Sequence, residues 1–156
     1  MTNIQNKIIK GINLIPYKFK NKPLVLGGLA MEYYGLRETT HDYDYMVSPE
    51  DWKNLKIKYP NNINLFGGKT EEDVDATINL LDINVDLIST LYQIDYNFLK
   101  KGSTEFNDYL IISVDKQLLV KTLERLTNKT HKSIQDTQLL TDFICLKQYS
   151  KDKIFN

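Results

Sequence analysis

The sequence predicts an α+β fold in which a mixed β-sheet is flanked by helices and followed by a C-terminal helical segment. Three observations lead to this prediction. Short apolar runs bounded by glycine, proline or polar residues indicate buried strands in the first two thirds of the chain. Apolar residues at helical spacing alternate with these runs. The last third shows two helical patterns, at 113–126 and 133–148. We therefore expect a sheet-containing core at 1–110 and a helical segment at 111–156 that packs on it.

The first half of the chain carries clear start and stop signals for its elements. Thr2 can cap a first helix, and Gly27-Gly28 ends an apolar run that is typical of a buried strand. Ser48-Pro49 marks another helix start, because serine caps well and proline suits the first turn. The predicted helices cover 2–13, 29–36 and the residues between Ser48 and Pro60, and the predicted strands cover 23–26, 41–47, 63–66, 77–81 and 83–88.

Composition and charge narrow the class of protein. The chain has 156 residues, of which 42% are hydrophobic and ten are tyrosines, so it can bury a core and is unlike a disordered protein. Twenty basic and twenty acidic side chains cancel, so bulk charge favours neither a nucleic-acid coat protein nor a membrane-surface binder. No apolar run is long enough to span a membrane, and the N-terminus lacks a signal-peptide pattern. We therefore expect a cytoplasmic protein.

The sequence offers few residues for disulfide or zinc chemistry. Cys145 is the one cysteine, which excludes an intramolecular disulfide and a cysteine-based zinc cluster. It lies in the apolar run at 143–146, so we expect a small buried hydrophobe. His41 and His131 are too few and too far apart in the sequence to indicate a zinc site.

A basic stretch runs from Lys18 to Lys22, with Tyr17 and Phe19 interleaved. The plainer interpretation is a solvated connector, because charged side chains usually lie at the surface. Lys18, Lys20 or Lys22 could instead bind a polyanion. The sequence leaves both interpretations open.

Carboxylates within strand patterns are the strongest functional signal. Asp42 and Asp44 are two apart, so on a strand they point to the same face. Aspartate is disfavoured in strands and like charges on one face repel, so a bound divalent cation is a good reason for the pair. Asp86 also interrupts an apolar strand pattern. If the two strands are neighbours, three carboxylates come together and can hold two metal ions for an in-line phosphoryl displacement.

Each acid also has a plainer interpretation. Asp42 and Asp44 could protect an exposed edge strand from aggregation, and Asp86 could be an isolated exposed aspartate. The Gly27-Gly28 turn favours the functional interpretation, because glycines at a strand-to-helix junction let backbone N–H groups approach a phosphate. A Gly-Gly turn alone would be a weak signal.

Together these motifs resemble the DNA polymerase β-like nucleotidyltransferase superfamily. In that superfamily an apolar residue and a Gly-Gly or Gly-Ser turn precede a helix. Two acids flanking one residue then follow on a strand, and a third acid lies on a later strand. The matching segments here are Leu26-Gly27-Gly28, Asp42-Tyr43-Asp44 and Val85-Asp86-Leu87, within a resemblance that covers residues 23–90. The match looks closest to a bacterial and viral branch of the superfamily. That branch includes the toxin–antitoxin-like nucleotidyltransferase toxins of abortive-infection systems and small antibiotic-modifying nucleotidyltransferases.

This resemblance implies a role for each matched residue. Asp42, Asp44 and Asp86 would bind Mg²⁺ or Mn²⁺ and act in catalysis. Asp42 and Asp44 would also bind the triphosphate, and Asp86 would accept the proton of the acceptor hydroxyl. Gly27 and Gly28 would cradle phosphate.

Three further residues are candidates for nucleotide binding. Arg37 would neutralise developing charge, with a surface ion pair as the alternative. Members of the branch that this sequence resembles often carry an Arg-x-Thr or Arg-x-Ser step before the acids. Thr40 is our candidate for that step, although it lies one residue further on than usual and Thr39 fits the spacing directly. Lys121 would reach phosphate from the helical segment, with a solvated helix lysine as the alternative.

The sequence thus predicts an enzyme that transfers a nucleoside monophosphate from a nucleoside triphosphate such as ATP to a hydroxyl. The acceptor could be RNA, a protein side chain or a small molecule. The alternatives are an inactive module of the same fold that binds a nucleotide or a protein, and a chain that needs a partner to complete its site. In the helical segment, Lys132 and Asp136 match a Lys-Asp step of the toxin-like branch only loosely, because Ser133 replaces an acid.

Overall fold

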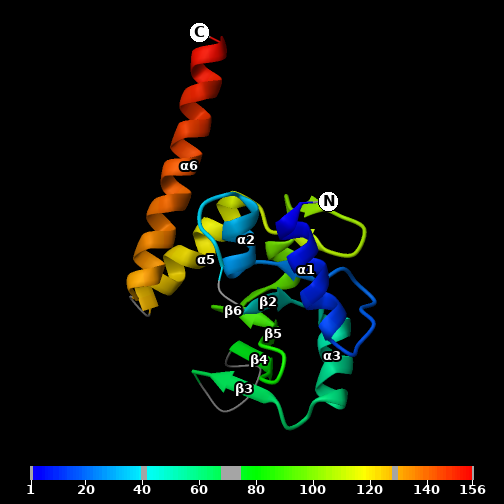
Figure 1. Ribbon diagram of the computed structural model, residues 1–156. Helices are drawn as coiled ribbons and strands as arrows, with labels where there is room; N and C mark the ends of the chain where they lie inside the picture. The colour runs from blue at the N-terminus through cyan, green and yellow to red at the C-terminus, as the bar shows by residue number, and fades with distance from the viewer. Residues whose placement is uncertain (1, 40–41, 68–74, 128–129, 156) are drawn as a thin grey trace. The chain divides into compact units, whose positions relative to one another are not determined.

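The computed structural model describes residues 2–39, 42–67, 75–127 and 130–155 (Figure 1). Contacts divide the chain into two compact units, Met1–Ser113 and Val114–Asn156. The sequence placed this boundary between residues 110 and 111. The first unit extends further because Ile111 pairs with Val25 and the Ile112 N–H donates to the Val25 carbonyl at 3.0 Å. That the helical segment packs on the core stays a prediction.

The first unit is built on a seven-stranded mixed sheet, which confirms the predicted α+β fold with its mixed sheet, flanking helices and C-terminal helical segment. Across the sheet the order is β3-β4-β5-β2-β1-β9-β8. The pairs β2–β5 and β1–β9 are parallel, and the other neighbours are antiparallel. The strands are β1 (Leu24–Val25), β2 (Tyr43–Met46), β3 (Ile63–Phe66), β4 (Asp75–Leu80), β5 (Val85–Ile88), β8 (Thr104–Glu105) and β9 (Leu110–Ile111).

The first helix, α1 (Asn3–Leu14), begins where the sequence predicts. Thr2 and Gln5 form a reciprocal capping box, in which each side chain accepts from the other residue's backbone N–H. α1 contacts the sheet through Tyr45, whose phenol donates to the carbonyl of Ile8 at 2.9 Å. Burial raises the pKa of the Tyr45 phenol, so it remains a donor. Gly11 makes this approach possible, because a Cβ there would collide with the Tyr45 hydroxyl.

The second helix, α2 (Gly27–Tyr33), begins two residues before the predicted start at 29, because both glycines lie in its first turn. Its end is set by Gly35, which has a φ of +72°. The Gly35 N–H donates to the Glu32 carbonyl at 2.9 Å, and the Leu36 N–H donates to the Met31 carbonyl at 3.0 Å. This is the hydrogen-bond pattern of a Schellman ending.

The third helix, α3 (Pro49–Lys58), is capped by Ser48 as predicted, and its Asp51 also fixes the connector that carries Lys18 to Lys22. Asp51 is 0% exposed. Its carboxylate accepts from the Tyr17 hydroxyl at 2.6 Å and from the backbone N–H groups of Lys20 and Asn21 at 2.9 Å. The connector is therefore a defined loop held by hydrogen bonds.

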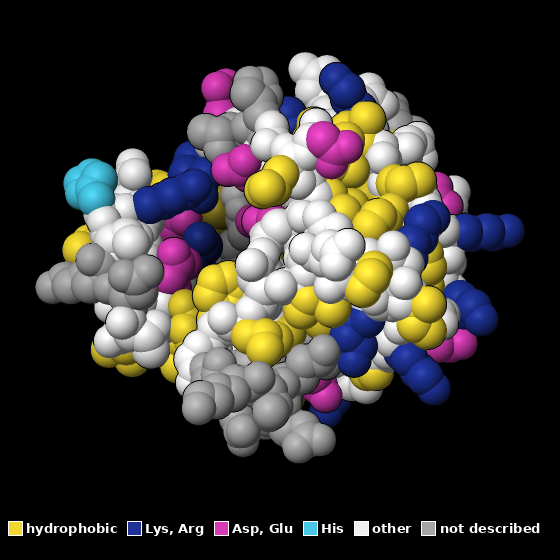
Figure 2. Space-filling view, turned by 90° about the horizontal axis from the view of Figure 1, so that it is seen from below, with side chains coloured by type: hydrophobic (Ala, Val, Ile, Leu, Met, Phe, Trp, Pro, Cys, Tyr) yellow, Lys and Arg dark blue, Asp and Glu magenta, His cyan; other side chains and the backbone are white. Residues whose placement is uncertain are grey.

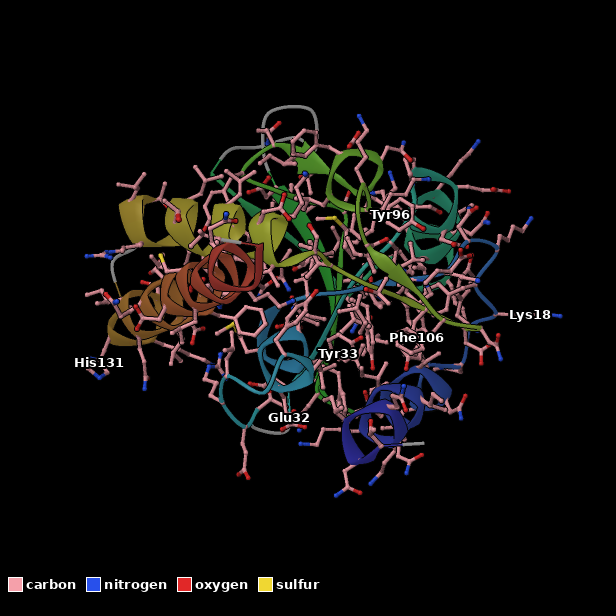
Figure 3. All side chains as sticks on the ribbon, turned by 90° about the horizontal axis from the view of Figure 1, so that it is seen from above. Lys18, Glu32, Tyr33, Tyr96, Phe106 and His131 are labelled. Carbon is pink, nitrogen blue, oxygen red and sulfur yellow. The ribbon has the colours of Figure 1, made fainter. Side chains whose placement is uncertain are left out.

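The lysines of this loop are placed at the surface. Lys20 pairs with Glu50 at 3.7 Å and Lys22 pairs with Glu105 at 2.7 Å. Lys18 is exposed and projects outward (Figure 3). The face shown in Figure 2 carries basic and acidic side chains interspersed with hydrophobic ones. Binding of a polyanion by these lysines stays a prediction.

Residues 90–111 contain elements for which the sequence analysis made no prediction. β6 (Thr90–Leu91) and β7 (Ile94–Asp95) form a separate two-stranded sheet, and α4 (Tyr96–Leu99) follows. Asp75 anchors the turn between β6 and β7, since its carboxylate accepts from the backbone N–H groups of Tyr92 at 2.6 Å and Gln93 at 2.8 Å. Both turn residues have positive φ, at 53° and 62°.

The second unit consists of α5 (Val114–Thr127) and α6 (His131–Phe155), which pack against each other (Figure 1). The predicted helices at 113–126 and 133–148 are confirmed, although α6 extends to Phe155. The expected burial of Cys145 is wrong, because this residue is exposed. Successive residues of a helix turn by about 100°, so the apolar run at 143–146 cannot direct all four side chains to one partner. Neither this helix nor any other in the described part of the chain is both long and apolar enough to cross a membrane.

Candidate active site

Asp44 and Asp86 are direct neighbours on the sheet. β2 and β5 pair in parallel with Asp44 opposite Asp86, which places their backbones about 4.8 Å apart. Both residues are half-buried. Tyr45 and Leu87, the next residues along the two strands, are 0% exposed and belong to the core. The two carboxylates therefore share the opposite face of the sheet, where their mutual repulsion is unfavourable unless a cation lies near them.

The turn at Gly27 lies against the first of these carboxylates. Gly27 has a φ of +66°, and a Cβ added to it would lie 2.8 Å from Oδ2 of Asp44. Glycine is therefore required here for two reasons, the left-handed backbone and the lack of space beside the carboxylate. The turn that the sequence assigns to phosphate and the acid that it assigns to metal are in contact.

Gly28 lies against the loop that follows α2. A Cβ on Gly28 would overlap Oγ1 of Thr39 and would lie 3.2 Å from Thr39 Cβ and 3.7 Å from Arg37 Nη1. Arg37 also donates from Nη1 to the carbonyl of Glu38 at 3.3 Å. The structure thus brings Arg37 and Thr39 to the glycine turn. Thr40 and His41 lie outside the described residues.

The loop at Thr39 is held in place by Glu32, which lies on α2 (Figure 3). Oε1 of Glu32 accepts from the Thr39 N–H at 2.9 Å and pairs with the Lys7 ammonium at 3.0 Å. Burial alone would raise the pKa of the Glu32 carboxyl, but these two donors outweigh it and hold the pKa below its usual value. Glu32 thus remains ionised and links α1, α2 and the Thr39 loop. Glu32 lies three residues before Gly35, and nothing in the sequence around it predicted this role.

Asp86 is held by residues that the sequence analysis did not select. Asn79 on β4 is directly opposite Asp86 on β5 and donates from Nδ2 to its Oδ1. Asn64 on β3 in turn donates from Nδ2 to Oδ1 of Asn79. A row of four polar side chains therefore crosses the sheet from β3 to β2, formed by Asn64, Asn79, Asp86 and Asp44. The available sequence signal was the polar alternation of Thr77 and Asn79 within an otherwise apolar strand.

Asp42 is less closely associated with this pair. The predicted strand at 41–47 is observed only at Tyr43–Met46, so Asp42 precedes β2, and its side chain is exposed. Within 2–39, 42–67, 75–127 and 130–155, no group of three or more His, Cys, Asp or Glu side chains comes together in a way that could hold a metal ion. The structure therefore juxtaposes two of the three predicted acids.

The donor set of this pair is compatible with one hard cation. Carboxylate oxygens suit Mg²⁺ or Mn²⁺, and Mg²⁺ is commonly bound by one or two carboxylates while water and substrate phosphates complete its shell. Asp44 and Asp86 supply two such carboxylates on adjacent strands. The backbone of Gly27 lies next to the Asp44 carboxylate. These residues fit one divalent ion with a phosphate ligand.

Lys121 lies on α5 in the second unit. The alternative prediction for it, a solvent-exposed helix lysine, is wrong because its side chain is buried. It is 7% exposed, and its ammonium lies 3.1 Å from Asp136 and 3.3 Å from Glu124. Asp136 is 0% exposed, whereas Lys132 is exposed. The loosely matched Asp136 thus forms a buried ion pair with Lys121, and binding of phosphate by Lys121 stays a prediction.

No protein-family model matches the chain, and no curated protein matches it in sequence. Among solved structures, JHP933 from Helicobacter pylori is 16% identical with a TM-score of 0.43, and the match covers 89% of this chain and 63% of that one. A candidate nucleotidyltransferase from H. pylori is 15% identical with a TM-score of 0.41, and this match covers 85% of this chain and 63% of that one. The chain thus spans less than two thirds of either structure. Similarity at this level describes the fold only coarsely and assigns no residue of the site.

Proposed function

We propose that this chain is a nucleotidyltransferase that moves a nucleoside monophosphate from a nucleoside triphosphate to a hydroxyl in the presence of Mg²⁺ or Mn²⁺. One observation carries the proposal. Asp44 and Asp86 lie side by side in parallel register, and the Gly27 backbone lies against the Asp44 carboxylate. Two adjacent carboxylates beside a glycine turn are suited to a cation and a phosphate chain together.

The acids, the glycines and the arginine have different tasks in this proposal. Asp44 and Asp86 would hold the divalent ion, which supplies charge neutralisation at the phosphates when bound. Gly27 and Gly28 would let the phosphate chain approach the backbone, because neither residue has a side chain of its own. Arg37, at the same turn, offers a guanidinium to the negative charge that develops on the phosphates.

The reaction requires a base beside the acceptor. The acceptor hydroxyl oxygen forms a bond to the α-phosphorus, and the bond from that phosphorus to the bridging oxygen of the β-phosphate breaks. Pyrophosphate leaves with the bonding electrons. We assign the hydroxyl proton to the Asp86 carboxylate, whose Oδ1 also accepts from Asn79.

The test is transfer of label from α-labelled triphosphates to cell RNA and to lysate proteins, with each of the four bases and with Mg²⁺ or Mn²⁺. We expect label in one acceptor class, and we expect Asp44→Asn and Asp86→Asn to reduce it to background. Asp82→Asn is the matched control, because Asp82 is an exposed carboxylate in the turn between β4 and β5. Transfer by Asp44→Asn at the wild-type rate would show that the site assignment is wrong.

A binding module without catalysis is the second candidate, and one observation favours it. In the described part of the chain Asp42 does not join the other two acids in a group of three, whereas a two-metal site needs more ligands than one pair supplies. Such a module would show a Mg²⁺-dependent thermal shift with a triphosphate and no transfer to any acceptor. The same assay mixtures therefore separate the two functions.

A further inference from the structure

We propose that Asn79 is a positioning residue that fixes the carboxylate of Asp86 for the cation. This inference rests on the proposed function, because it concerns the same pair of acids. Asn79 and Asp86 are directly opposite each other on β4 and β5. The Asn79 Nδ2 donates to Oδ1 of Asp86. One of the two Asp86 oxygens is thereby engaged, and the other remains for a cation or a proton.

The orientation of the Asn79 amide is fixed from its other side. Its Oδ1 accepts from Nδ2 of Asn64 and from Oγ1 of Thr77, the latter at 3.3 Å. With its oxygen occupied by two donors, the amide presents its NH₂ group to Asp86. An ionised carboxylate can only accept, so this is the one orientation that satisfies every group in the row. The row therefore sets the Asp86 carboxylate before any cation binds.

The backbone on which this amide is mounted is also well anchored. The Asn79 N–H donates to the Asn62 carbonyl at 3.0 Å, and Nδ2 of Asn62 donates to the Asn79 carbonyl at 3.1 Å. These two bonds hold the β3–β4 pairing and do not involve the Asn79 side chain. Asn62 therefore supports the strand, whereas Asn79 contacts Asp86 and Asn64 orients the Asn79 amide.

A ligand carboxylate that is held in place needs less ordering when the cation binds. Residues that hydrogen-bond to a metal ligand commonly contribute about 10–100-fold to metal affinity or activity. We therefore expect Asn79→Ala to weaken Mn²⁺ binding by about 10–100-fold. We expect Asn64→Ala to weaken it less, because the Asn79 amide stays present but loses one of the two donors that orient it.

The experiment measures Mn²⁺ binding to the full chain by electron paramagnetic resonance, with Mn²⁺ alone as the probe. The variants are Asn79→Ala, Asn64→Ala and the matched control Asn62→Ala, and thermal unfolding is recorded for each. Asn64 is exposed, so its variant tests the row even where Asn79→Ala fails to fold. The inference requires weaker binding in Asn79→Ala or Asn64→Ala with unchanged affinity in Asn62→Ala.

Two outcomes would contradict this inference alone, and they differ from a failure of the proposed function. Unchanged Mn²⁺ affinity in Asn79→Ala and Asn64→Ala overturns the role of the row alone. An equal loss in Asn62→Ala shows that only strand integrity matters, which also overturns it. A wild-type chain that binds no Mn²⁺, or an Asp44→Asn variant that binds it as well as wild type, overturns the proposed site together with this inference.

Discussion

Gly27→Ala tests the contact between the glycine turn and Asp44 directly. The substitution adds one methyl group at a backbone φ of +66° and at 2.8 Å from Oδ2 of Asp44. The left-handed backbone costs an L-residue about 1–2 kcal/mol. The Asp44 side chain must also move, and a displaced rotamer costs about 0.5–1.5 kcal/mol. We therefore expect a loss of stability of about 1.5–3.5 kcal/mol.

Gly35→Ala is the matched control for this substitution. Gly35 has a φ of +72°, similar to that of Gly27, but nothing lies within 4 Å of a Cβ added there. Its variant should lose only the backbone contribution of about 1–2 kcal/mol. The difference between the two variants therefore isolates the contact with the carboxylate.

Thermal unfolding measures both losses of stability. In a chain of this size the midpoint temperature falls by about 2–4 °C for each kcal/mol lost. Mn²⁺ binding is then compared at a temperature where both variants are folded. We expect Gly27→Ala to weaken Mn²⁺ binding and Gly35→Ala to leave it unchanged. The reasoning is refuted if the two variants unfold alike and bind Mn²⁺ as the wild-type protein does.

Two other predictions concern charged side chains that form ion pairs. Lys121→Met removes the lysine that pairs with the Asp136 carboxylate, which is 0% exposed. We expect the free energy of unfolding to fall by about 3–5 kcal/mol. Adding Asp136→Leu should recover most of this loss in chemical denaturation, and a double variant as unstable as the single one would contradict the buried pair. Glu32 has a lowered pKa, so the stability it contributes is complete above the usual glutamate pKa and is lost as the pH falls through its folded pKa. Glu32→Gln should flatten this acid-side dependence in unfolding measured against pH. An unaltered profile would show that the Thr39 N–H and the Lys7 ammonium do not favour the ionised form.

Much of the local structure could be predicted from the sequence, because its causes lie within a few residues. Thr2 caps α1 and Ser48 caps α3, since each side chain accepts from a backbone N–H group of the first turn. Pro49 begins α3 because its fixed φ suits the first helical position. The strand at Ile63–Phe66 begins and ends as predicted. Cys145 was misjudged because a short apolar run does not tell which side of a helix has a partner.

The elements within 90–111 show where local patterns fail. β9 has only two residues, yet it pairs in parallel with β1. β6 and β7 depend on hydrogen bonds from their turn to Asp75, well over ten residues earlier in the chain. Such short strands bury too few residues to show a periodic pattern, and their stability comes from partners that are distant in the sequence.

The sequence by itself determined that Asp44 and Asp86 each interrupt an apolar strand and that a Gly-Gly turn precedes the first of them. Only the tertiary structure decided that β2 and β5 are parallel neighbours with these acids in register, and that Asn79 holds the second acid. The physical reason is that period-two alternation shows which residues of a strand share a face. It does not show which strand lies beside it, because the pattern is identical for every possible neighbour. Strand order and register instead arise from packing and hydrogen bonds between residues far apart in the chain. The third acid, Asp42, immediately precedes β2 and so lies outside the strand pairing that places the other two.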